Sequence, residues 1–150
     1  MRIAFASCAF NRVFQQQPVW GRIAPHQPDH LVLLGDIFYL DVLGPNAPQL
    51  MTDDEFAQHL FALHVELIAQ PDFAALVGAM PPGTVHAIWD DHDFLWNDAM
   101  GIADQPAHRE KLRLTTAFRE ALRIALAQQL APGSFPAFYN DARFWDLAQP

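Results

Sequence analysis

Residues 28–39 read PDHLVLLGDIFY and contain the stretch that decides the fold. The run Leu31–Leu34 is wholly apolar, and Gly35 and Asp36 stop it with a pair typical of a turn. Four apolar residues between turn signals are short for a helix and favour a strand. Because the run has no polar alternation, it predicts a strand covered on both faces, as in a parallel sheet with helices on each side.

Strands are also predicted on both sides of this stretch. Ile3–Ala6 is a short apolar run that ends at Ser7 and Cys8, and Thr84–Trp89 is rich in β-branched and aromatic residues. A further strand start is predicted at Arg143–Trp145, near the end of the sequence. The chain therefore offers three core strands within its first 90 residues.

Helices are predicted between and after these strands. Thr52 and Glu55 fit a capping box, in which each side chain satisfies a backbone amide of the first turn. The apolar spacing then predicts helices over residues 53–69, from Pro71 to about residue 77, and over residues 104–129. Strands alternating with helices indicate an α/β layered fold, and the length suits a single domain spanning residues 1–150.

Composition excludes several classes of protein. The formal net charge of −8 argues against a nucleic-acid-binding surface, which requires dense Lys and Arg. Cys8 is the only cysteine, so no internal disulfide can form. No apolar run approaches the roughly 20 residues that span a bilayer, and the N-terminus lacks the pattern of a signal peptide. If Met1 is the true start, we expect a cytoplasmic protein.

Residues that carry chemistry follow each of the three predicted strands. Cys8 follows the first, Asp36 and Tyr39 follow the second, and residues 90–93 follow the third. Taken singly, Cys8 reads as a small core residue, Gly35-Asp36 as a turn and Tyr39 as an aromatic at the core edge. Parallel strands, however, would bring the three groups to one edge of the sheet, where open α/β sheets bind ligands.

The segment Asp90-Asp91-His92-Asp93 is the strongest of the three groups. Three carboxylates around one imidazole repel one another, and a cation or strong hydrogen bonds must offset this repulsion. Asp98 strengthens the local negative field. The alternative interpretation is a solvated acidic turn. The other histidines show no ligand-like spacing, and two of them, His59 and His64, are predicted to be helix-packing or surface residues.

Three segments of the chain resemble the PhoD-type alkaline phosphatases, a branch of the metallophosphoesterases. The segments are FASC at residues 5–8, PDHLVLLGDIFY at residues 28–39 and AIWDDHDFLWNDA at residues 87–99. With the helices between and after them, the resemblance covers residues 3 to about 128. It implies a layered metallophosphoesterase-like sheet with flanking helices.

The resemblance implies a dinuclear metal centre. Cys8 stands where the wider superfamily has a first aspartate, and a thiolate there suits Fe³⁺. Asp36 would bridge the two metals, Tyr39 would ligate the iron as phenolate, and Asp91 would bind the second metal. That second metal is expected to be Ca²⁺, with Mn²⁺ or Zn²⁺ as alternatives for the site.

The resemblance also implies a reaction. His92 would contact the substrate phosphate or protonate the leaving oxygen, and Asp93 would orient His92. The expected activity is hydrolysis of phosphate monoesters or diesters, from a small-molecule or lipid substrate, by a hydroxide that two metals activate.

One departure qualifies that expectation. Members of this family continue with further strands and a histidine-bearing metal motif, whereas no histidine follows His108 here. We therefore expect a partial domain whose sheet lacks its C-terminal strands. The alternative function is a truncated, non-catalytic metal-binding or interaction domain, which would self-associate through its exposed sheet edge.

Overall fold

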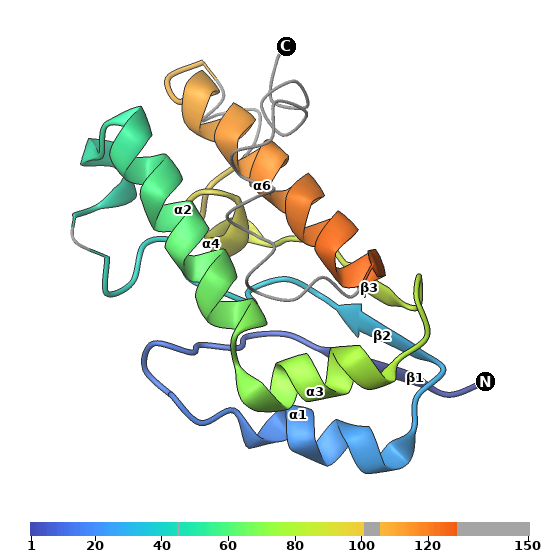
Figure 1. The fold of residues 1–150 in the computed structure, drawn as a ribbon. Coiled ribbons are helices and arrows are strands. Elements are labelled where there is room, and N and C mark those ends of the chain that lie inside the picture. The colour runs from blue at the N-terminus through green and yellow to red at the C-terminus, as the bar shows by residue number, and fades with distance from the viewer. Residues whose placement is uncertain (45, 101–105, 129–150) are drawn as a thin grey trace.

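The computed structural model describes residues 1–44, 46–100 and 106–128 and shows a mixed α/β fold around a small sheet (Figure 1). The strands and helices, in chain order, are β1 (Ile3–Ala6), α1 (Pro18–Ile23), the 3₁₀ helix η1 (Ala24–His26), β2 (His30–Leu33), the 3₁₀ helix η2 (Pro48–Leu50), α2 (Asp53–Ile68), α3 (Pro71–Ala79), β3 (Val85–Ala87), α4 (Asp91–Phe94) and α6 (Arg109–Gln128).

The three strands of the described residues are parallel and follow the order β1-β2-β3. Ile3 pairs with His30 across β1 and β2, and Leu31 pairs with Val85 across β2 and β3. The prediction of three parallel strands is therefore confirmed. β1 has the predicted bounds, and the ends of β2 and β3 are shifted by one or two residues. The strand start predicted at Arg143–Trp145 lies outside the described residues.

Within the part of the chain that the structure describes, one face of this sheet is buried and the other is largely exposed, so the prediction of a strand covered on both faces is wrong. Leu31 and Leu33 are fully buried, whereas Val32 between them is half-buried and Leu34 is 40% exposed. On the neighbouring strand β1, Phe5 of the same exposed face is 70% exposed. The physical reason is the two-residue period of a strand, which sends alternate side chains to opposite faces. An unbroken apolar run hides this alternation because both sets of side chains are apolar.

The helices begin and end close to where the sequence predicts. Thr52 and Glu55 form the predicted capping box, with the Glu55 amide donating to Thr52 Oγ1 at 3.3 Å and the Thr52 amide donating to Glu55 Oε2 at 2.8 Å. The last helix begins at Arg109 rather than near residue 104, and it packs against α2 (Figure 1). Within the described ranges no single helix is long and apolar enough to cross a membrane; α2 and α3, bent by 68°, pass that test only as a pair.

Both histidines of α2 are buried packing residues. His59 Nε2 donates to the Leu40 carbonyl at 2.8 Å, and His64 Nδ1 donates to the Leu60 carbonyl at 2.8 Å. The His64 ring lies against Phe38 and Phe118. Complete burial lowers the pKa of His64 to about 4, because a charged imidazolium is poorly solvated there.

This shift makes stability depend on pH. Between pH 6.5 and 4 the unfolded chain takes up a proton at His64 that the folded chain does not. The free energy of unfolding therefore has its full value, as far as His64 is concerned, above this window and falls as the pH drops through it. The loss reaches about 3 kcal/mol at the acidic end. We expect His64→Asn, which can still donate to the Leu60 carbonyl, to remove this part of the dependence. Urea unfolding at a series of pH values checks it, and an equal pH dependence in both proteins would contradict it.

Candidate metal centre

The loops that follow β1, β2 and β3 meet at the carboxyl edge of the sheet. The Cys8 amide donates to the Gly35 carbonyl at 3.3 Å, and the Ala9 amide donates to the Asp36 carbonyl at 2.8 Å. On the other side, a Cβ atom on Gly35 would lie 2.6 Å from the Asp90 nitrogen. The three groups that the sequence places after the strands are therefore neighbours in space, as the parallel arrangement requires.

Two residues at this edge have a strained backbone. Cys8 has φ of 58° and Asp36 has φ of 52°, in the left-handed region that residues other than glycine seldom adopt. Each such residue costs on the order of 1–2 kcal/mol. Strain of this kind persists where the surrounding structure holds it, and it gathers at functional sites.

Asp36 forms a group of three potential ligands with Asp91 and His92. One ligand atom each from Asp36, Asp91 and His92 all lie within 4.8 Å of one another. Burial raises the pKa of Asp36, and the carboxylates of Asp90 and Asp91 add to the rise, while nearby His92 opposes it. Among the described residues, the buried Oδ1 of Asp36 has no hydrogen-bond partner. A buried carboxylate oxygen without a donor, next to further carboxylates, is the environment that a cation would stabilise.

Cys8 and Tyr39 lie beside the same carboxylate. Cys8 Sγ is 3.9 Å from Asp36 Oδ2. The Tyr39 ring is held between Phe10 and His92, with centroid distances of 4.4 Å to each. Burial, with the Asp36 carboxylate and then Cys8 adding to it, raises the pKa of Tyr39 well above its ordinary value. Asp36 is thus the shared member of two groups, one with Cys8 and Tyr39 and one with Asp91 and His92.

The segment around Asp91 is organised by its own carboxylates. Asp90 caps the short helix α4, with its Oδ1 accepting from the Asp91 amide at 2.9 Å. The Asp91 carboxylate accepts from the His92 amide at 3.0 Å and from the Asp98 amide at 2.5 Å. Backbone amides therefore orient the Asp91 carboxylate, and its remaining lone pairs are available to a ligand.

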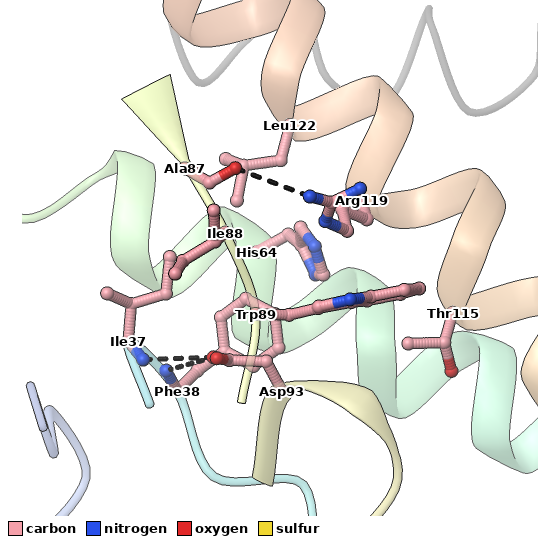
Figure 2. A pocket seen from close by; sticks show the side chains of 10 residues that line it. All are labelled: Ile37, Phe38, His64, Ala87, Ile88, Trp89, Asp93, Thr115, Arg119 and Leu122. Atoms are coloured by element: carbon pink, nitrogen blue, oxygen red, sulfur yellow. Dashed lines mark hydrogen bonds between the residues drawn. The ribbon is translucent and has the colours of Figure 1, made fainter. Parts of the chain in front are cut away.

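Asp93 makes different contacts from those expected of a residue that orients His92. Its side chain is buried and accepts from the amides of Ile37 at 2.9 Å and Phe38 at 3.2 Å, as Figure 2 shows. The amides of Asp36 and Asp90 donate to the other oxygen, at 2.5 and 3.1 Å. Burial raises the pKa of Asp93 to about 6, against these hydrogen bonds, which lower it. Asp93 thus holds the loop after β2 onto the loop after β3, and it does not orient His92.

The carboxylate that orients His92 belongs to Asp41. His92 Nδ1 lies 2.6 Å from Asp41 Oδ1, and the Asn97 amide donates to Asp41 Oδ2 at 2.9 Å. Because a carboxylate only accepts, Nδ1 carries the hydrogen and Nε2 is the nitrogen left for a ligand. Sequence reasoning missed this role. The only signal in the sequence was an aspartate five residues after Asp36.

Arg119 of α6 contacts the end of β3 and the residues that follow it. Its guanidinium carbon lies 4.5 Å from the centroid of the Trp89 ring, and its Nη2 reaches the Ala87 carbonyl at 3.5 Å (Figure 2). Between these residues and Asp93 is a cavity of about 20 Å³, room for a single water molecule. The helix α4, which carries Asp91 and His92, also packs against α6, and the cavity is too small for a substrate.

A scan against protein-family models, a search of curated proteins and a search of solved structures each find no match. The chain is thus described as a mixed α/β protein with a group of carboxylate, imidazole, thiol and phenol side chains at the carboxyl edge of a parallel sheet. The PhoD-type resemblance and the roles it implies stay predictions.

Proposed function

We propose that the chain is a metal-dependent phosphoesterase of the metallophosphoesterase type, which hydrolyses phosphate monoesters or diesters at a two-metal site. The observation that supports this most is the position of Asp36 between two groups of potential ligands. A carboxylate has two oxygens and can give one to each of two ions, which a single mononuclear site would not need. The layered metallophosphoesterase-like sheet belongs to the same proposal.

The side chains present fit the metals that the resemblance implies. Thiolate, phenolate and carboxylate ligands from Cys8, Tyr39 and Asp36 suit Fe³⁺, and the oxygen of Asp91 with that of Asp36 suits Ca²⁺ or Mn²⁺. The unpartnered Oδ1 of Asp36 is in keeping with such a role. Bound ions would supply Lewis-acid polarisation of a phosphoryl oxygen and a lowered pKa of a water molecule.

Residues of the chain would then transfer a proton to the departing alcohol. Asp41 fixes the His92 ring through Nδ1, so His92 Nε2 can donate a proton to the oxygen of the departing alcohol. For this step the His92 ring must carry a hydrogen on both nitrogens, with Nδ1 toward Asp41 and Nε2 toward the departing oxygen. His92 is the proposed catalytic acid, and Asp41 positions it.

A second candidate function is a non-catalytic metal-binding or interaction domain. The observation that favours it is the uncovered face of the sheet, where four apolar side chains are at least two-fifths exposed: Ile3, Phe5, Leu34 and Ile88. Apolar surface of this kind commonly marks a contact with another protein or another copy. For this second function we expect the purified chain to self-associate, which size-exclusion chromatography would detect.

The test is hydrolysis of a chromogenic phosphate monoester and diester by the purified chain, with iron, calcium and manganese supplied. We expect Asp36→Asn to lower turnover by at least about 100-fold, because it removes a ligand of both metals. Asp41→Asn should lower it by about 10–100-fold while bound metal is largely retained. Asp54→Asn, at an exposed position in the first turn of α2, is the matched control and should leave turnover unchanged.

The outcomes separate the two functions. Turnover that survives Asp36→Asn would contradict the proposed site. Metal binding that depends on Asp36 without any turnover would favour the non-catalytic function. A protein that shows no metal binding, no turnover and no self-association would contradict both functions.

A further inference from the structure

The exposed face of the sheet carries two histidines on neighbouring strands. His30 opens β2 and His86 lies in the middle of β3, where it pairs with Val32. His30 is half-buried and His86 is exposed, so neither belongs to the core. Their rings are nearly parallel, with centroids 5.4 Å apart and planes inclined by 25°.

The facing nitrogens have a spacing that suits a shared metal. His30 Nδ1 lies 3.2 Å from His86 Nε2. Two imidazoles bound tetrahedrally to one ion, at metal–nitrogen distances of about 2.0–2.1 Å, place their nitrogens about 3.3 Å apart. The backbone of two hydrogen-bonded strands already holds the two rings, so metal binding requires little movement of the chain.

We propose that His30 and His86 form a second metal site, for a divalent transition ion of the Zn²⁺, Cu²⁺ or Ni²⁺ class, with water completing the coordination. Without metal, one ring donates a hydrogen to the other across the 3.2 Å contact. Binding needs a lone pair on both facing nitrogens. The donating ring therefore moves its hydrogen to its own other nitrogen, and no net proton is released by neutral rings.

This site is distinct from the Asp36 group in position and in chemistry. His30 lies at the amino end of β2, whereas Asp36 lies beyond its carboxyl end, six residues and roughly 20 Å of extended chain away. Two imidazole nitrogens favour Zn²⁺, Cu²⁺ and Ni²⁺ over Ca²⁺ and Mg²⁺, which prefer oxygen ligands. The inference therefore does not rest on the proposed phosphoesterase.

The test is zinc and copper titration of the full chain carrying Asp36→Asn, which weakens the first site. One equivalent of ion is expected to bind, and His30→Gln or His86→Gln should each weaken that binding by at least about tenfold. His26→Gln, at an exposed histidine of η1, is the matched control and should bind as the parent does. If both glutamine variants bind like the parent, the pair is only a hydrogen bond and the proposal fails.

A second measurement shows whether the bound ion is held by His30 and His86 or by other groups. In nitrogen-15 spectra of the same parent protein, zinc should shift the facing nitrogens, Nδ1 of His30 and Nε2 of His86. With zinc bound, each ring should carry its hydrogen on the nitrogen that faces away from the ion. Zinc that shifts neither ring, or only one, would overturn the two-histidine site. Both histidines lie outside the core, so these variants are expected to fold.

Discussion

Asp93→Ala is expected to lower the free energy of unfolding by about 3 kcal/mol or more, because it leaves four backbone amides without an acceptor. These amides belong to residues 36, 37, 38 and 90, and they join the loop after β2 to the loop after β3. Each buried donor left without a partner costs about 1–3 kcal/mol, less where water enters. Urea unfolding at neutral pH measures the change.

Two further variants show whether the lost acceptor is the cause. Asp93→Asn keeps one carbonyl oxygen but turns its NH₂ group toward amide donors, so an intermediate loss is expected. Asp54→Ala, at an exposed position, should change stability by less than about 0.5 kcal/mol. If Asp93→Ala is as stable as the parent, Asp93 does not hold the two loops together.

Gly35→Ala is expected to lower the free energy of unfolding as much as Asp93→Ala does, and to weaken metal binding at the Asp36 site as well. Gly35 has φ of 95°, and a Cβ atom there would lie 2.6 Å from the Asp90 nitrogen and 2.7 Å from the Asp90 Cβ. Backbone strain and overpacking each cost about 1–3 kcal/mol, and neither neighbour is a flexible side-chain end. We expect a loss of about 3 kcal/mol or more, measured by urea unfolding.

The same substitution pushes the loop with Asp90 away from Asp36. Metal affinity, measured by titration, should fall because Asp91, a proposed ligand, moves with Asp90 and away from Asp36. Gly78→Ala is the matched control, since nothing lies within 4 Å of a Cβ there and a helical alanine gains about 0.5–1 kcal/mol over glycine. A Gly35→Ala protein that keeps its stability and metal affinity would show that the two loops need no close approach.

The sequence alone determined the local elements of this protein and the side chains available for chemistry. The capping box of Thr52 and Glu55 and the turn at Gly35 depend on residues close in the chain, so local rules are enough to find them. Parallel strands also follow from the order of elements, and they bring Cys8, Asp36 and Asp91 to one edge.

Only the tertiary structure decided which partner each side chain takes. Asp41 and Asp93 are both aspartates near the same edge, yet one orients His92 and the other binds the amides of the loop after β2. That choice depends on distances between loops 50 or more residues apart, which no local pattern contains. The uncovered face of the sheet and the pairing of His30 with His86 have the same origin, because a strand's composition does not say which of its faces the helices will cover.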